Sequence, residues 1–220
     1  NTSVDALKLV KRQNLQSLKE YQNGFFEIQD ASSQLIAPFL DLNSGMTVID
    51  ACAGAGGKSL HIAALMKNAG NIISMDVEER KLIELERRAK RGGVKIIKTR
   101  LINEQTIHQL KNVADRLLLD VPCSGLGILK RNPDAKWKLN LDFITEIIKT
   151  QQHILSTYSS MLKLDGILVY ATCSILPSEN QHQVELFLKN HSDFTFMEDC
   201  KILAKDGFDG FYMAKLKKVK

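Results

Sequence analysis

The chain contains few cysteines, and none are paired as they would be to bind zinc or exchange disulfides. Its four cysteines, Cys52, Cys123, Cys173 and Cys200, are far apart, and no C-x-x-C motif occurs. The five histidines are not spaced as metal ligands either. We therefore expect reduced thiols, a cytoplasmic protein and no bound metal.

Long apolar runs and repeats are also missing. No segment approaches the roughly 20 consecutive apolar residues that span a bilayer. The first residues do not have the basic segment followed by an apolar one that marks a secretory signal. No repeat of fixed period, low-complexity tract or Gly/Ser-rich linker divides the chain. We expect a monomer with no membrane partner.

The composition fits one globular domain. The chain has 220 residues, of which 44% are hydrophobic and 25% are charged, enough to bury a core without disulfides or metals. The formal net charge is +5. This charge permits nucleic-acid binding but equally suits many other basic proteins, so it does not decide the function.

Short β-rich runs alternate with amphipathic segments from residue 46 onward, a pattern typical of a parallel sheet covered by helices. The predicted strands are residues 47–51, 71–77, 94–99, 116–121 and 166–172. The predicted helices are residues 58–67, 78–91, 104–112, 141–164 and 178–190, and the opening residues 1–22 are also expected to be helical. Residues 194–198 and 211–217 have no room for a helical crossover between them and predict an antiparallel hairpin. The predicted fold class is α/β, a doubly wound, mostly parallel sheet with a C-terminal antiparallel hairpin.

A glycine-rich loop, Asp50-Ala-Cys-Ala-Gly-Ala-Gly-Gly-Lys58, directly follows the first predicted strand. Glycines let backbone amides approach a ligand closely. An ATPase phosphate loop would need glycine at Cys52, and a dinucleotide loop would need G-x-G-x-x-G, whereas Gly54, Gly56 and Gly57 give G-x-G-G. The spacing favours a third interpretation, a loop that holds the methionine and ribose parts of S-adenosylmethionine.

Asp76 ends the second predicted strand about 20 residues after these glycines, where an acidic side chain accepts hydrogen bonds from ribose hydroxyls. An alternative is that Asp76 is the N-cap of the helix that begins near Glu78. The position supports nucleoside binding without identifying the nucleoside.

Two thiols and a carboxylate follow two further strands. Asp120 and Cys123 come at the end of the fourth strand and Cys173 at the end of the fifth, so parallel neighbours would bring them to one edge of the sheet. Methylation of a pyrimidine at carbon 5 needs such a group, because a thiolate that adds to carbon 6 makes carbon 5 nucleophilic. Asp120 could stabilise charge at N3, and the second thiol could assist elimination.

The residues alone do not decide which thiol attacks. A thiol would need a cationic neighbour such as Lys58, or a helix N-terminus, to be largely thiolate. The alternative is that both cysteines are small, half-buried residues at strand ends.

Residues 129–138 form a basic segment with one tryptophan. Lys130 and Arg131 could neutralise RNA phosphates, and Trp137 could stack on a base. Alternatively, Trp137 anchors the long helix in the core. The basic clusters at residues 87–91 and 215–220 are expected to be solvated faces.

The chain resembles the Sun-type RNA (cytosine-5) methyltransferases, whose bacterial members include the enzyme that modifies 16S ribosomal RNA. The likeness covers residues 24–217. It lies in Gly24-Phe-Phe-Glu-Ile-Gln-Asp-Ala-Ser-Ser33, the glycine-rich loop, Asp120-Val-Pro-Cys-Ser-Gly125 with residues 131–137, Tyr170-Ala-Thr-Cys-Ser174 with Glu179-Asn180, and Asp209-Gly-Phe-Tyr212. One difference is Ala55, where the family usually has proline.

The resemblance implies a Rossmann-like methyltransferase that modifies RNA, with ribosomal RNA favoured and transfer RNA possible. It assigns Cys173 as the nucleophile, Cys123 as the helper in product release and Asp120 as the acid that contacts the base. It implies that S-adenosylmethionine is bound by Cys52, Ala53, Gly54, Ala55, Gly56, Gly57, Lys58, Asp76 and Asp120, with Asn103 in place of an aspartate usual in the family.

The resemblance also implies a domain division. Family members carry RNA-binding sequence ahead of the catalytic domain, so residues 1–23 are expected to be the end of such a region and residues 24–220 the catalytic domain. Two other functions stay open, a methyltransferase of a protein or small molecule and an idle RNA-binding assembly factor.

Overall fold

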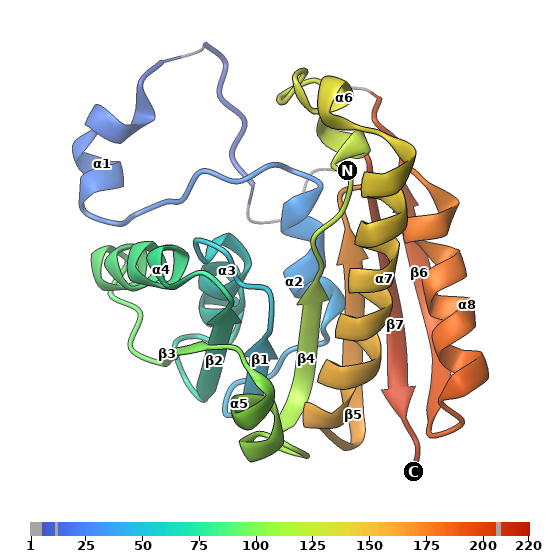
Figure 1. The fold of residues 1–220 in the computed structure, drawn as a ribbon. Helices are drawn as coiled ribbons and strands as arrows, with labels where there is room; N and C mark the ends of the chain where they lie inside the picture. The colour runs from blue at the N-terminus through green and yellow to red at the C-terminus, as the bar shows by residue number, and fades with distance from the viewer. Residues whose placement is uncertain (1–5, 12, 206–207) are drawn as a thin grey trace.

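The structure, a computed structural model, describes residues 6–11, 13–205 and 208–220. In this part of the chain seven strands form one sheet in the order β3-β2-β1-β4-β5-β7-β6 (Figure 1). Their bounds are β1 Thr47–Asp50, β2 Asn71–Asp76, β3 Ile97–Leu101, β4 Ala114–Asp120, β5 Leu162–Thr172, β6 Phe194–Ile202 and β7 Phe211–Lys218. Strands β1 to β5 are parallel, and β7 is antiparallel to both β5 and β6. The predicted fold class is confirmed.

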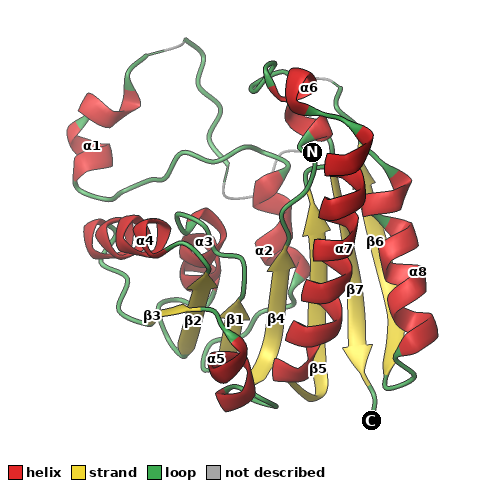
Figure 2. Cartoon of the chain, viewed as in Figure 1, coloured by secondary structure: helices red, strands yellow, loops and turns green. Residues whose placement is uncertain are grey.

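Helices and short 3-10 turns connect the strands (Figure 2). The helices are α1 Lys19–Gln22, α2 Ile36–Phe39, α3 Gly57–Leu65, α4 Glu79–Arg91, α5 Glu104–Gln109, α6 Ala135–Lys138, α7 Leu141–Tyr158 and α8 Gln181–Asn190. The 3-10 turns are Leu15–Ser17, Ser33–Leu35, Leu126–Ile128, Ser159–Met161 and Pro177–Glu179. Among the described residues, no helix is both long enough and apolar enough to cross a membrane.

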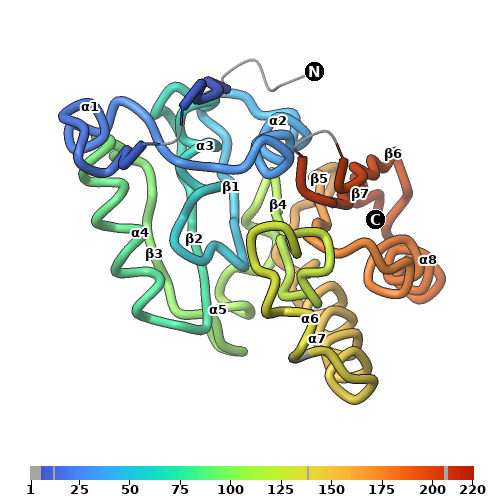
Figure 3. Tube along the Cα trace, turned by 90° about the horizontal axis from the view of Figure 1, so that it is seen from above, coloured from blue at the N-terminus to red at the C-terminus, as the bar shows by residue number. Residues whose placement is uncertain are grey.

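The helices bury both faces of the sheet. Helices α5, α7 and α8 pack on one face, where Leu155 and Phe187 join the core around Tyr170. Helices α2 and α3 pack on the opposite face around Val169, and α4 packs against α3 through Leu85. Figure 3 shows α2 and α7 on opposite sides of β4. Both faces are therefore largely apolar, as expected of a parallel sheet covered by helices on both sides.

Two of the predicted helices end or begin in the wrong place. The helix predicted over residues 141–164 ends at Tyr158, and β5 already begins at Leu162, which pairs with Ala114 of β4. An irregularity near Asp165, which has a φ of 62°, separates this first pair from the regular ladder. Pairing across the sheet thus overrides the helical pattern. The helix predicted from residue 178 is interrupted at Asn180, and α8 begins one residue later.

The N-terminal prediction was also wrong. Within residues 6–11 and 13–23, only the turn Leu15–Ser17 and the four-residue helix α1 are helical. The remaining predicted positions, 1–5 and 12, lie outside the described residues. Strand β3 begins three residues later than predicted, at Ile97, and Val94 packs ahead of it against the cluster between α3 and α4.

The parallel strands place acidic residues at one edge. Asp50, Asp76 and Asp120 are the last residues of β1, β2 and β4, and Thr172, the last residue of β5, precedes Cys173. Since these strands run in the same direction, all four ends meet at their shared carboxyl edge.

Candidate active site

The glycine-rich loop between β1 and α3 is held by backbone bonds to β2. The Ala53 N–H donates to the Met75 carbonyl at 2.9 Å, and the Gly54 N–H donates to Asp76 Oδ2 at 2.9 Å. Gly56 has a φ of +87°, and a Cβ there would lie 2.4 Å from Leu85 Cγ, so α4 can pack closely against the turn. The chain therefore needs glycine at this position for both backbone conformation and space.

Asp76 supports this loop and is not the N-cap of α4, a position that Glu78 takes. Its Oδ2 binds Gly54, and its Oδ1 accepts a hydrogen bond from the Glu78 N–H at 2.9 Å. The carboxylate therefore joins the glycine-rich loop to the start of α4.

Asp50 is fully buried beneath the loop. Its Oδ2 accepts a hydrogen bond from Ser59 Oγ at 2.6 Å, whereas its Oδ1 is buried without a hydrogen-bond partner. Burial raises the pKa of Asp50 to about 6. A carboxylate oxygen left unpaired in the interior fits a ligand that supplies a donor or a positive charge.

The charges around the loop distinguish between classes of ligand. Burial raises the pKa of Cys52 well above its ordinary value, and the carboxylates of Asp120, Asp50 and Asp76 raise it further. Together with Lys58 and Lys81, these three carboxylates leave the site acidic on balance, which suits a cationic ligand better than a phosphate.

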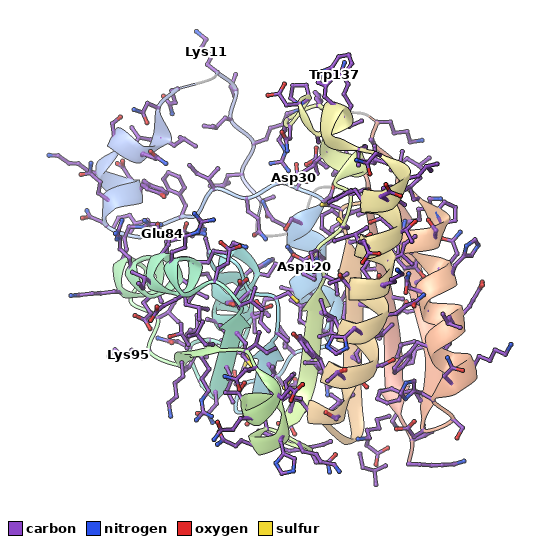
Figure 4. All side chains as sticks on the ribbon, viewed as in Figure 1. Lys11, Asp30, Glu84, Lys95, Asp120 and Trp137 are labelled. Carbon is purple, nitrogen blue, oxygen red and sulfur yellow. The ribbon has the colours of Figure 1, made fainter. Side chains whose placement is uncertain are left out.

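Lys58, in the first turn of α3, forms an ion pair with Asp120 across the sheet edge. Burial alone would lower the pKa of Lys58, but the Asp120 carboxylate outweighs it, and the net shift is upward. The ammonium therefore stays charged within the site. Figure 4 shows Asp120 at the upper end of β4.

The two thiols meet at this edge. Cys123 Sγ and Cys173 Sγ are 3.2 Å apart, and both side chains are partly buried. The hydrogen bond with Cys123 lowers the pKa of Cys173 and, together with the charge of Lys58, outweighs burial and the Asp120 carboxylate, which raise it. The same bond, together with burial and the Glu179 carboxylate, raises the pKa of Cys123. Cys173 is therefore the more readily formed thiolate of the pair.

Asn103 lies at the start of α5 and caps it. Its Oδ1 accepts a hydrogen bond from the Thr106 N–H at 2.9 Å, and the Thr106 hydroxyl accepts one from the Asn103 N–H. The side-chain oxygen is thus occupied by the cap, and its predicted role toward a cofactor stays a prediction.

The three predicted substrate-binding residues differ in their surroundings. Trp137 on α6 is 79% exposed, so the alternative that it anchors a helix in the core was wrong. Lys130 is exposed nearby, and Figure 4 shows Trp137 at the outer end of the molecule. The Arg131 guanidinium, by contrast, is paired with Asp209 and lies 3.7 Å from Asp30.

Several functional contacts were not anticipated from the sequence. The cluster at residues 87–91 is not simply a solvated face, because Arg88 and Arg91 are mostly buried and both pair with Glu27. Arg88 also donates a hydrogen bond to the Ala55 carbonyl of the glycine-rich loop at 2.7 Å. Lys215, expected on a solvated face, is also buried and pairs with acidic side chains. The one sequence signal for these contacts was the resemblance of residues 24–33 to the corresponding segment of the Sun-type methyltransferases.

A cavity of about 960 Å³ lies apart from these reactive groups. It is formed between the N-terminal segment and α3, with Leu9, Phe26, Leu60 and Ala64 among its lining residues. None of the residues at the thiol pair or the Lys58–Asp120 pair lines it. Among the described residues, no cluster of three or more His, Cys, Asp or Glu could hold a metal ion.

The family model for the 16S rRNA methyltransferase RsmB/F matches residues 37–217. The chain belongs to this family. The RsmB/F match includes the glycine-rich loop, both thiols and the final hairpin. The ribosomal RNA small subunit methyltransferases B of Yersinia enterocolitica and Pasteurella multocida are 35% and 36% identical to 96% and 97% of this chain.

The chain spans about half the length of these curated RsmB relatives, 51% and 52%. Two solved structures from Pyrococcus horikoshii are also similar to it, each at 29% identity over 95% of this chain. NSun6 with SFG, an S-adenosylmethionine analogue, gives a TM-score of 0.86, and 57% of its chain is covered. A methyltransferase homologue protein gives a TM-score of 0.83, with 73% covered.

Proposed function

We propose that this chain transfers a methyl group from S-adenosylmethionine to carbon 5 of a cytosine in RNA. The observation that carries the proposal is the thiol pair, 3.2 Å apart, at the sheet edge that also holds the Lys58–Asp120 pair. RsmB/F membership and the names of the relatives support ribosomal RNA as the substrate. Transfer RNA is the other RNA class to test.

The glycine-rich loop fits S-adenosylmethionine, whose sulfonium and ammonium groups suit an acidic site. In this proposal the backbone of the loop faces the methionine part, with the Asp50 carboxylate beneath it, and Asp76 accepts the ribose hydroxyls. When bound, the cofactor supplies an electrophilic methyl group. The proposed binding residues are Cys52, Ala53, Gly54, Ala55, Gly56, Gly57, Lys58, Asp76, Asn103 and Asp120.

Cys173 acts as the nucleophile in the proposed reaction. Its thiolate adds to carbon 6 of the cytosine, which makes carbon 5 nucleophilic enough to take the methyl group. The Asp120–Lys58 pair holds a proton beside N3, where negative charge builds as the thiolate adds. In the final step Cys123 takes the carbon 5 proton as a base, the double bond between carbons 5 and 6 re-forms, and Cys173 leaves carbon 6 as a thiolate.

The target base must be unpaired or flipped out of its stack, at a cost of a few kcal/mol. Exposed Trp137 offers a stacking face, and Lys130 offers a positive charge for phosphate. Arg131 remains a proposed contact that RNA would have to share with Asp209. We further propose that residues 24–220 form the catalytic domain and residues 1–23 the end of an RNA-binding region.

The decisive experiment uses RNA that contains 5-fluorocytidine, whose fluorine blocks elimination. The protein is incubated with this RNA and labelled S-adenosylmethionine and run on a denaturing gel. We expect a covalent adduct with the wild-type chain and none with Cys173→Ala, while Cys200→Ala, a matched control outside the site, still forms it.

Other outcomes would redirect the proposal. Methylation that survives in Cys173→Ala would indicate a methyltransferase that uses no thiol. Cofactor binding without any adduct would indicate another substrate, and failure to bind the cofactor would indicate an idle RNA-binding protein.

A further inference from the structure

Glu179 is a completely buried carboxylate just before α8. Its Oε2 accepts hydrogen bonds from the Ser124 N–H at 2.8 Å and from Gln151 Nε2 at 3.0 Å, and its Oε1 accepts one from Ser174 Oγ at 2.6 Å. Within the described residues no cation pairs with it. A buried charge held only by neutral donors is costly, which calls for an explanation of its position.

The positions of the three donors provide that explanation. Ser124 directly follows Cys123, and Ser174 directly follows Cys173. These residues are 50 positions apart in the sequence, yet one carboxylate binds both, and their hydroxyl oxygens lie 3.1 Å from each other. Glu179 thus links the loop after β4 to the loop after β5 next to the reactive sulfurs.

Neighbouring contacts fix this link to the fold. Gln151 of α7 donates from the same Nε2 to the Pro122 carbonyl at 3.0 Å, on the other side of Cys123. Tyr170 donates its hydroxyl to the Glu179 carbonyl at 2.7 Å. The adjacent Asn180 donates to the Ser174 carbonyl at 3.0 Å. Residues next to each cysteine are therefore hydrogen-bonded to Glu179 or Asn180, either directly or through Gln151.

We propose that Glu179 is a positioning residue whose carboxylate holds the two thiol loops at the separation where Cys123 and Cys173 share a hydrogen bond, with their sulfurs 3.2 Å apart. The catalytic importance of this role rests on the proposed function, but the thiol geometry itself does not. Loss of the carboxylate would leave Ser124 and Ser174 without their shared acceptor, so the loops could separate and Cys173 would lose the bond that favours its thiolate.

The test is the pH profile of Cys173 alkylation by iodoacetamide, read on the peptide by mass spectrometry without RNA or cofactor. In Glu179→Ala we expect the midpoint to move to higher pH and the rate at pH 7 to fall about two- to tenfold, the range that one hydrogen bond contributes. Glu179→Gln should restore the profile, because an amide can accept from Ser124 and donate to Ser174 Oγ. Glu185→Ala, on the exposed face of α8, is the matched control.

A double variant separates positioning from a general structural effect. In Cys123→Ala the hydrogen-bond partner of Cys173 is already gone, so adding Glu179→Ala should change the Cys173 profile little further. An unchanged profile in folded Glu179→Ala, or an equal shift in the Cys123→Ala background, would overturn the proposal. If Glu179→Ala shows no melting transition, Glu179→Asp replaces it. We then expect a smaller shift of the Cys173 profile in the same direction, and an unchanged profile would contradict the proposal.

Failure of this inference and failure of the proposed function give different results. If Cys173 alkylation depends on Glu179 but no RNA adduct forms, the role of Glu179 stands and the proposal of cytosine methylation fails. If an adduct forms through Cys173 but its alkylation does not depend on Glu179, cytosine methylation stands and the role of Glu179 fails.

Discussion

Cys123 and Cys173 have different electrostatic neighbours although their sulfurs touch. Cys173 lies where Lys58 lowers its pKa and Asp120 raises it, whereas Cys123 lies where the Glu179 carboxylate raises its pKa. Thiolate fraction governs nucleophilicity near neutral pH. The bond between the two thiols, which lowers the pKa of Cys173 and raises that of Cys123, therefore favours Cys173 as the thiolate of the pair.

Removing one or the other of the two charges beside Cys173 should change its rate of alkylation in opposite directions. Lys58→Met removes the cation and leaves Asp120 unpaired, so the pKa of Cys173 should rise and its alkylation at pH 7 should slow. Asp120→Asn removes the carboxylate, so alkylation should become faster. Lys149→Met, on an exposed part of α7, is the control. Shifts of the same sign in both variants would show that the Lys58–Asp120 pair acts on packing and not on charge.

Asp50 makes stability depend on pH. Its pKa is about 6 in the folded protein and about 4 in an unfolded chain. Because burial raises the pKa, this group's contribution to stability is present below about pH 4 and is lost as pH rises through 6. The lost contribution is about 3 kcal/mol for about two pKa units.

Asp50→Asn should therefore gain stability relative to the wild type between pH 4 and 7, by at most about 3 kcal/mol. Urea unfolding of both proteins across this pH range measures the difference, with exposed Asp134→Asn as the control. The same variant should bind S-adenosylmethionine more weakly, because an amide replaces the buried carboxylate. A difference in stability that stays constant with pH would mean that Asp50 does not titrate in this range.

At the scale of the elements, the segment before the sheet is tied to the glycine-rich loop through α4. Glu27 pairs with Arg88 and Arg91, and Arg88 donates to the Ala55 carbonyl. Arg91 also stacks on Tyr21, with its guanidinium carbon 4.2 Å from the ring centroid. Displacing this segment should therefore loosen the glycine-rich loop.

Arg88→Ala should raise the Kd for S-adenosylmethionine several-fold, because one buried charged hydrogen bond contributes about 1.5–3 kcal/mol and part of that holds the loop. Glu27→Gln should have a smaller effect in the same direction. Arg87→Ala, one residue away and exposed, should leave the Kd unchanged. Calorimetric titration measures all three, and equal effects of Arg88→Ala and Arg87→Ala would contradict the link.

The elements most accessible to sequence reasoning were the strands. Each predicted strand overlaps an observed one, because buried parallel strands are apolar and end at turn residues. The start of β5 at Leu162 was predicted as helix, since its strand character comes from the pairing of Leu162 with Ala114 on β4. Helix α2 was missed because four residues carry too little periodicity.

At the scale of the whole molecule, the exposed segment around α6 stands at the outer end, beyond the carboxyl edge that carries the thiols (Figure 4). Trp137→Ala should weaken RNA binding by about 1–3 kcal/mol, the contribution of one base stack. The melting temperature and the cofactor Kd should not change, because the ring is 79% exposed. Fluorescence anisotropy with labelled RNA checks this, and Phe25→Ala, another exposed aromatic, is the control.

The sequence by itself determined which residues follow which strands, and so which of them share the carboxyl edge. Asp76, Asp120, Cys123 and Cys173 could be assigned to one edge because chain direction in a parallel sheet follows from the strand and helix pattern. It also determined the glycine positions of the loop, of which Gly54 and Gly56 have a positive φ.

Only the tertiary structure decided how these groups act on one another. The 3.2 Å contact between the sulfurs, the three bonds to Glu179 and the bond from Arg88 to Ala55 join residues from separate elements. Burial and charge set the pKa of each group, and both depend on distances through space that no spacing along the chain specifies.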